Sequence, residues 1–430
     1  MNKAGVDATA EQGSKPTAWT WPELTLCGIM LLFLVPNFSH ALYCGYEEGW
    51  WPLKPRDYNL SLAVVALVTM LFCKPAFSLM ALALLTIPMP RILDAALLQR
   101  YEILEWGGHQ VYVFTMVSLW VISAAGILST GTSKGPQTAI AVAVVTIMAC
   151  TGANLYEWSG RASWTLIPGR MSGWHLDPNN SPIIMCLMLG ILFTFEKRFW
   201  WNLVWTSVAA VGIALTMSRS GMMVFGALVS VYILFNLRER FLAILSVALV
   251  AVPVLAISLG VLGASNERKG IVKNADAASR MEAIYSLDFE KLKSPERKKD
   301  LLDAWEAVCR QPVTGWGTGS GALRWRPHNM IVSHWIDVGI LGILQYGGAL
   351  LIFTFCCFLR RFRGLFCLIP VWLFIPCSQV LLEMPAYWYA WGVAAYTLFP
   401  KRFAIVLGAP AGGGNTTPEN LHGLSSQSSP

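Results

Sequence analysis

The sequence predicts an all-α polytopic membrane protein with about 12 transmembrane helices. Three observations lead to this fold class. The 430 residues are 55% hydrophobic and 13% charged, whereas about a quarter of the residues in an ordinary soluble domain are charged. The apolar residues form blocks that reach the roughly 17–25 residues needed to cross a bilayer. Short basic clusters separate these blocks, as expected for loops between spans.

The expected spans follow these blocks. We place them at roughly 24–42, 58–73, 76–96, 110–130, 137–156, 181–195, 199–217, 220–236, 241–263, 331–359, 365–382 and 385–400. Only Lys74-Pro75 separates the second from the third, so one kinked helix is the alternative. Residues 24–263 would thus hold the first nine helices and residues 331–402 the last three, with a large, largely helical outer loop, 264–330, between helices 9 and 10.

The basic residues predict which side of the membrane each loop faces. Those between spans fall on alternate turns, with only Glu196 and Glu239 as acids beside them: Lys74, Lys134, Lys197, Arg198, Arg238, Arg240, Arg360, Arg361, Arg363, Lys401 and Arg402. By the positive-inside rule this face is cytoplasmic. It would also carry the N-terminal segment 1–23 and a disordered tail, 403–430, rich in Gly, Ser, Asn and Pro. The polar, non-repetitive sequence is expected on the opposite face, where we expect the function to reside: 45–57, 97–109, 157–180, 218–220 and 264–330.

Charge and cysteine content exclude several classes of protein. The net charge of +7 does not indicate a nucleic-acid partner, because the topology explains the basic clusters. The ten cysteines show no CxxC or Cys/His metal spacing, so neither a disulfide framework nor a zinc site is predicted. The first 20 residues lack the design of a signal peptide, so the first apolar block is expected to remain as an anchor.

The outer loop contains one clear helix signal. Ser294-Pro295-Glu296 places a capping serine before a proline at the first helical position. One apolar face follows at helical spacing, which can lie on the membrane surface or on the bundle: Leu301, Leu302, Trp305, Val308 and Cys309. The glycine-rich run Gly315–Gly321 after it predicts a flexible turn.

Arg219 is the first candidate site residue. It lies in Ser218-Arg219-Ser220, a tight turn between two spans, with no acid near it in the sequence. An arginine at this depth is costly unless it is paired or binds an anion. The alternative is an interface anchor whose side chain snorkels to water.

His328 is the second candidate, in Arg326-Pro327-His328-Asn329 before the tenth span. Proline is expected to hold Arg326 extended, so that the helix starts close to His328. The positive end of the helix dipole favours neutral imidazole, the form that can act as a general base. The alternative is a capping or interfacial histidine, and His334 is expected to be a packed residue.

The third feature is Arg170-Met171-Ser172-Gly173-Trp174-His175-Leu176-Asp177-Pro178-Asn179-Asn180, a turn that enters the sixth span. Arg161 and Arg170, together with Arg219, Arg280 and Arg326, can form an anion site, since the guanidinium fork suits phosphate oxygens. The alternative is a solvated loop neutralised by Asp177 and Glu157. Arginines beside a histidine and many tryptophans suit a sugar carried on a lipid phosphate.

From Arg161 to Ile343 this pattern resembles the O-antigen ligase and polymerase superfamily of bacterial inner membranes. The resemblance rests on the order and spacing of several short motifs: Arg170-x-Ser-Gly, Asp177-Pro178-Asn179, Ser218-Arg219-Ser220-Gly221, Arg280, Trp305, Pro312-Val313-Thr314-Gly315-Trp316-Gly317, His328-Asn329 and Gly339-Ile340-Leu341-Gly342.

The resemblance implies a multi-span glycosyltransferase whose active site faces the periplasm. It would move a glycan from undecaprenyl pyrophosphate to lipid A–core oligosaccharide by metal-independent inverting transfer, without a cofactor. His328 would be the base, and Arg219 and Arg280 would bind pyrophosphate. Arg161, Arg170 and Asn329 would be further substrate contacts. The partners would be these two substrates and membrane lipid.

Three alternatives stay open. A polymerase of the same superfamily would extend the glycan on its carrier, and another relative would transfer it to a protein hydroxyl. A transporter of lipid-linked glycans is the non-enzyme alternative, but it would be expected to carry ionisable residues within the spans. The sequence shows no convincing buried acid in a span, and Glu383 is expected at an outer turn. Trp174 and Trp305 either shape the site or pack in the core or interface.

Overall fold

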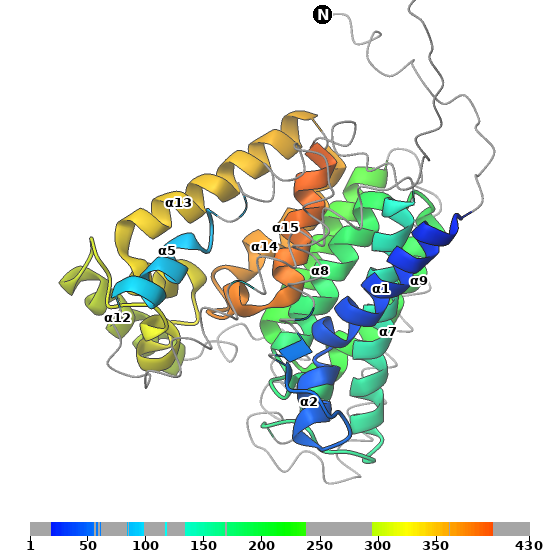
Figure 1. The fold of residues 1–430 in the computed structure, drawn as a ribbon, viewed down its shortest axis with the longest axis horizontal. Helices are drawn as coiled ribbons and strands as arrows, with labels where there is room; N and C mark the ends of the chain where they lie inside the picture. The colour runs from blue at the N-terminus through cyan, green and yellow to red at the C-terminus, as the bar shows by residue number, and fades with distance from the viewer. Residues whose placement is uncertain are drawn as a thin grey trace, which may run out of the picture.

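The computed structural model describes residues 19–55, 57–58, 61, 84, 86–98, 117, 134–167, 170–237, 295–360 and 362–398. Within these ranges all regular structure is helical (Figure 1). The main α-helices are α1 (Trp21–Phe38), α2 (Ala41–Glu47), α5 (Met89–Leu93), α7 (Gly135–Trp158), α8 (Asn180–Phe195), α9 (Phe199–Thr216), α12 (Pro295–Arg310), α13 (Met330–Arg360), α14 (Leu365–Phe374) and α15 (Pro385–Leu398). A further helix, Arg219–Leu237, follows α9.

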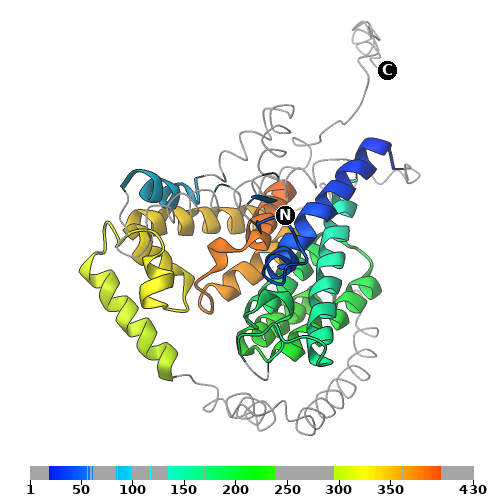
Figure 2. The same cartoon turned by 60° about the horizontal axis from the view of Figure 1, so that its bottom comes forward.

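A bundle of α1, α7, α8 and α9 forms one side of the molecule, and α14 and α15 connect it to α12 and α13 on the other side (Figures 1 and 2). Helices α8 and α15 are buried along nearly their whole length. Because they are apolar all round, they can be surrounded by other helices instead of facing lipid on one side.

The described helices confirm a multi-pass membrane protein. Four of them are long and apolar enough to cross a bilayer: α7, α9, Arg219–Leu237 and α13; the bent pair of α1 and α2 makes a fifth if it is one span. The prediction of about 12 spans is therefore not confirmed, and three of them, 58–73, 110–130 and 241–263, lie almost entirely outside the described residues.

Two expected spans differ from the structure. The first, 24–42, is interrupted after Phe38 by a bend of 64°. His40 adopts a left-handed φ of 62° at this bend, where the chain turns into α2. The eleventh, 365–382, ends as a helix at Phe374. The chain then leaves the helix so that the carbonyl of Ile375 accepts a hydrogen bond from the N–H of Met330, at 2.8 Å.

The basic clusters of the described residues share one end of the molecule, as predicted. Lys134 precedes α7, and Lys197 and Arg198 join α8 to α9. Arg363 lies at the same end, because its carbonyl accepts a hydrogen bond from the hydroxyl of Thr194 near the end of α8, at 3.1 Å. The assignment of this end to the cytoplasm stays a prediction.

Helix α13 is broken at Gly339, and the glycine-rich loop before it fills the break. Gly339 has φ 72° and ψ −167°, which lies outside helical geometry. The carbonyls of Ile336 and Asp337 accept hydrogen bonds from the N–H groups of Trp316 (2.6 Å) and Gly317 (3.0 Å) instead of continuing the helix. The N–H of Ile340 donates to the carbonyl of Pro312 at 3.0 Å. The run expected to be a flexible turn is thus held by defined hydrogen bonds.

A buried ion pair joins this unit to α5. Asp337 Oδ2 lies 2.5 Å from Nη2 of Arg91, in ion-pair contact although without hydrogen-bond alignment, and both side chains are 1–2% exposed. Arg91 Nε donates to Nδ1 of His334 at 3.1 Å. Asp337 Oδ1 accepts from the N–H of Gly321 at 2.8 Å. The expectation that no acid is buried in a span is therefore wrong, whereas His334 is buried, as expected.

A second acid in the same region orders the loop. Asp94, which follows α5, accepts hydrogen bonds from the backbone N–H and the hydroxyl of Thr318, at 2.7 and 2.9 Å. The arginine of the ion pair lies one helical turn before Asp94, so residues 89–98 are fixed to the loop and to α13 at two points.

The described part of helix α12, Pro295–Arg310, buries a face that shares only Val308 with the predicted one. Ala304, Ala307 and Val308 pack with Val332 and Ile336 of α13. Small residues allow the two helices to approach closely, so the larger apolar side chains are turned outward. Three of them are 36–58% exposed: Leu301, Leu302 and Trp305.

The break in α13 predicts a strong dependence on glycine at one position. A Cβ at residue 339 would lie 2.0 Å from the carbonyl oxygen of Val313, at a backbone conformation that L-residues rarely adopt. We expect Gly339→Ala to lower the free energy of unfolding by roughly 1–3 kcal/mol or more, measured by thermal denaturation of the purified protein.

Gly347→Ala is the matched control, because a Cβ there meets no atom within 4 Å in the same helix. It should be neutral or stabilising by up to about 1 kcal/mol. Equal melting temperatures for the two variants would contradict the proposed role of the break.

The ion pair predicts a second set of stability changes. Arg91→Met leaves the carboxylate of Asp337 buried without its counter-charge, and should cost roughly 3–5 kcal/mol of stability. The double variant Arg91→Met/Asp337→Asn should be more stable than Arg91→Met alone, because the uncompensated charge is removed. Arg310→Met, which breaks an exposed pair with Glu306, is the control and should cost about 0–1 kcal/mol. A double variant less stable than Arg91→Met would refute this account.

Candidate functional site

His328 occupies a short, tightly held connection between the π-helical turn Gly321–Trp325 and α13. Its backbone N–H donates to Oε1 of Gln379 at 2.9 Å. The next residue, Asn329, accepts a hydrogen bond from the N–H of Val332 at 3.1 Å, so its side chain caps α13. Asn329 therefore has a structural contact, and its assignment to substrate stays a prediction.

The backbone around Pro327 differs from the expected extended form. Arg326 has φ 47° and His328 has φ 50°, both in the left-handed region. The N–H of Arg326 donates to the carbonyl of Gly321 at 2.9 Å and closes the preceding turn. A left-handed residue is the usual end of such a turn, and this requirement outweighs the preference of a residue before proline.

The imidazole of His328 lies in a cluster of charged side chains. It is 38% exposed, and its Nε2 is 4.0 Å from Oδ2 of Asp300 on α12. Burial lowers the pKa of His328, and Arg297 lowers it further, while Asp300 and Asp177 act in the opposite direction. A lowered pKa keeps the ring neutral near pH 7, so it can accept a proton.

Arg219 is half-buried at the first residue of the helix Arg219–Leu237. The hydroxyl of the preceding Ser218 donates to Oδ1 of Asn179 at 3.1 Å, and the backbone N–H of Asn179 donates to Asp177 at 2.8 Å. Because Asp177 influences the charge of His328, the turns that carry Arg219 and His328 lie in one region. The positive helix end at Arg219 is a suitable place for an anion.

Arg170 is buried and connects the same turns. Its Nε donates to the carbonyl of Thr216 at 2.9 Å, and its Nη2 donates to Oδ1 of Asn179 at 3.0 Å. Only 2% of the residue is exposed. These contacts show a structural role for Arg170, and its assignment to substrate stays a prediction.

Glu157 organises the loop for which a solvated basic loop was the alternative. Its carboxylate accepts four backbone hydrogen bonds, at 2.7–2.9 Å, from the N–H groups of Trp164, Thr165, Ser172 and Gly173. Charge-assisted hydrogen bonds of this kind are stronger than neutral ones. The loop therefore has a defined conformation, held by these hydrogen bonds. Arg161 is an exposed residue of this loop.

The two tryptophans lie at different places. Trp174 lines an open, apolar cleft of about 440 Å³ with Trp50, Tyr156, Trp164 and Met148. Trp305 of α12 meets Trp335 edge-on, with ring centroids 5.7 Å apart. Arg280 lies outside the described residues, so the structure does not place it.

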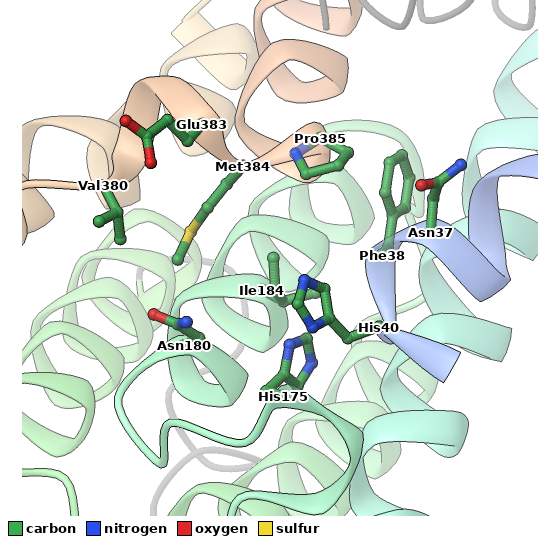
Figure 3. Close-up of a pocket in the computed structure, with 10 residues that line it drawn as sticks. All are labelled: Asn37, Phe38, His40, His175, Asn180, Ile184, Val380, Glu383, Met384 and Pro385. Atoms are coloured by element: carbon green, nitrogen blue, oxygen red, sulfur yellow. The ribbon is translucent and has the colours of Figure 1, made fainter. Parts of the chain in front are cut away.

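A polar cavity of about 230 Å³ lies beside these turns and was not predicted (Figure 3). It is lined by His40, His175, Asn180, Glu383 and six further residues, Asn37, Phe38, Ile184, Val380, Met384 and Pro385. Glu383 lies in a turn between α14 and α15, as expected, and is partly buried. The one sequence signal for the cavity is the run Asn37-Phe38-Ser39-His40, which interrupts the first apolar block.

Glu157→Gln should disturb the loop that carries Arg170 and Trp174. Each carboxylate oxygen of Glu157 accepts two backbone hydrogen bonds. In glutamine one of these oxygens is replaced by an NH2 group, which cannot accept them. Two backbone N–H groups then lose their acceptor, and each unpaired buried donor costs roughly 1–3 kcal/mol of stability. We expect a lower melting temperature and faster proteolysis within 159–179. Glu306→Gln, an exposed carboxylate on α12, is the control, and equal behaviour of the two variants would contradict this role.

Comparison with known proteins places the candidate base and Arg219 in one matched region. Residues 203–347 match the Wzy_C family, described as O-antigen ligase. No curated protein matches the chain. The matched region contains most of α9, Arg219, α12, the loop docked on α13, His328 and the break at Gly339. This part of the protein is therefore similar to a family of membrane glycosyltransferases that act on O-antigen and related lipid-linked glycans.

Proposed function

We propose that the protein is a ligase that transfers a glycan from undecaprenyl pyrophosphate to lipid A–core oligosaccharide. The observation that supports this proposal is a partly exposed histidine with a lowered pKa, which shares with Arg219 the region that matches the O-antigen ligase family. The location at the periplasmic face of a bacterial inner membrane is part of the proposal, and follows from the basic residues at the opposite end of the bundle.

In the proposed reaction an acceptor hydroxyl attacks the anomeric carbon of the donor glycan. The new C–O bond forms as the bond to pyrophosphate breaks, and the configuration inverts. The proton of the hydroxyl passes to the ring of His328, and the pyrophosphate leaves with the bonding electron pair. The imidazolium then lies 4.0 Å from the carboxylate of Asp300, which stabilises its charge.

The leaving group needs positive charge more than it needs a proton. Arg219 at a helix N-terminus supplies a guanidinium and oriented backbone N–H groups in one place. Arg280 and Arg161 are proposed as further contacts to phosphate oxygens, and Arg161 is exposed as this requires. The lipid tail of the donor would reach the site laterally from the bilayer.

Transport is the second candidate function, and the buried Asp337 is the observation in its favour. Ionisable residues within spans often mark transport pathways. The contacts of Asp337 support a structural role instead. Its carboxylate already meets the guanidinium of Arg91 and the N–H of Gly321, so both oxygens are engaged within the protein.

A transfer assay with purified protein tests the proposal. Undecaprenyl-pyrophosphate glycan would be the donor and lipid A–core the acceptor, and the product would be glycan-capped lipid A–core. We expect His328→Ala to lower the rate by roughly 10²–10⁴-fold. Arg219→Ala should also lower the rate, whereas Arg310→Ala, an exposed arginine on α12, should not.

Other products would favour the alternatives. Longer carrier-linked glycan with the acceptor ignored would indicate a polymerase, and glycan on a protein hydroxyl would indicate protein glycosylation. Full activity of a folded His328→Ala variant would remove the proposed base.

The charges around His328 predict two opposite changes in pH dependence. The base must be neutral, so the rate should fall as the pH drops through the pKa of His328. Asp300 raises that pKa, so Asp300→Asn should move the acidic limb of kcat/KM to lower pH. Arg297 lowers it, so Arg297→Gln should move the limb to higher pH.

Asp177 and Arg326 also act on this pKa and remain in place in both variants. Glu306→Gln, farther along α12, is the control and should leave the profile unchanged. Shifts of the same sign for Asp300→Asn and Arg297→Gln would show that another group controls the acidic limb.

A further inference from the structure

The cavity beside the candidate base has the size and position of a subsite. Its volume of about 230 Å³ is smaller than the roughly 300–1,000 Å³ of pockets for drug-sized ligands, so it suits one small ring. Its walls come from the end of α1, the turn at His175, the start of α8 and the segment before α15 (Figure 3). These segments are far apart in the sequence and converge only in the fold.

Two stacked histidines form the polar centre of the cavity. The rings of His40 and His175 lie 5.3 Å apart at an angle of 23°, and Figure 3 shows them together at its centre. Nδ1 of His40 is buried and has no hydrogen-bond partner in the described part of the chain. An unpaired buried nitrogen costs free energy, and a ligand hydroxyl can pair with it.

The polar groups of this cavity favour an uncharged ligand. Burial and the neighbouring His40 lower the pKa of His175 well below its ordinary value. Burial raises the pKa of Glu383, even though Arg91 acts to lower it. Neutral imidazole both donates and accepts hydrogen bonds, and the carboxyl group of Glu383 accepts them, which matches hydroxyl groups better than phosphate.

Apolar side chains complete the lining. Phe38, Met384 and Pro385 lie around the histidine pair in Figure 3. A sugar ring has both hydroxyl groups and an apolar C–H face, so it needs polar and apolar walls together. The cavity offers both kinds of wall.

The cavity is connected to His328 through one residue. Its residue Val380 follows Gln379, whose Oε1 accepts the hydrogen bond from the backbone N–H of His328. Its residue Asn180 follows Asn179, which binds the hydroxyl of Ser218 beside Arg219. A glycan at the candidate site can therefore extend one ring into the cavity.

We propose that this cavity is a subsite for one uncharged sugar residue, bound through its hydroxyl groups by His40, His175 and Glu383. The inference rests on the proposed glycan transfer. The sugar can belong to the acceptor oligosaccharide or to the donor glycan, and the same chemistry would recognise either one.

Steady-state kinetics of the full-length protein test this subsite, with donor and acceptor varied separately. Glu383→Gln, His40→Ala and the cavity-filling Val380→Phe should each raise the KM of one substrate by about tenfold, with kcat changed little. His40→Asn keeps a hydrogen-bonding group and should recover part of the affinity. Glu306→Gln is the control, and melting temperatures identify variants that do not fold.

The outcomes separate the subsite from the proposed function. A raised KM for lipid A–core places the acceptor sugar in the cavity, and a raised KM for the carrier-linked glycan places the donor sugar there. Unchanged KM values for both substrates in folded, active variants would overturn the subsite, as would a loss confined to kcat. A wild-type protein that transfers no glycan would instead overturn the proposed function.

Discussion

The carboxylate of Asp337 is the interaction on which the arrangement of the site depends. One oxygen meets the guanidinium of Arg91 and the other accepts the N–H of Gly321, so three distant segments meet at one side chain. The backbone carbonyl of the same residue binds the N–H of Gly317, because the break at Gly339 has freed it from the helix. His328 lies between Gly321 and Asp337 in the sequence. The hydrogen bond between these two residues therefore holds together the segments before and after His328.

The region around His328 consists of polar turns whose side chains and backbone groups form hydrogen bonds with one another. Glu157 holds a loop by its backbone N–H groups, and Arg170 joins that loop to the turn before Arg219. Charged residues that look alike in the sequence therefore have different environments. Arg170 is buried among backbone partners, whereas Arg161 is exposed on the loop surface. Such differences decide which arginines remain available to a ligand.

Part of the fold could be predicted from the apolar blocks, because a helix needs a minimum length to cross the bilayer. The limits of α7, α9 and α13 agree with the expected spans within two residues. The bend after Phe38 and the early end of α14 could not be predicted, since each depends on contacts with other segments. The break at Gly339 could not be predicted either, because it depends on hydrogen bonds with residues 312–317.

The candidate site was predictable only in part, for a related reason. Pro327, His328 and Arg219 stand out by residue type and by position at helix ends. Arg91 and Asp337 do not, because each lies within an apolar stretch and the two are far apart in the sequence. The pair of His40 and His175 was missed for the same reason, since their stacking is formed by the fold.

The cavity and the candidate chemistry come from different parts of the chain. His328 and Arg219 lie within residues 203–347, the region similar to O-antigen ligases. All ten residues that line the cavity, from Asn37 to Pro385, lie outside it. Mutations in the cavity walls can therefore accumulate without altering the residues proposed for bond formation. In evolutionary terms, such a separation would allow relatives to diverge in the sugar they accept while keeping one reaction.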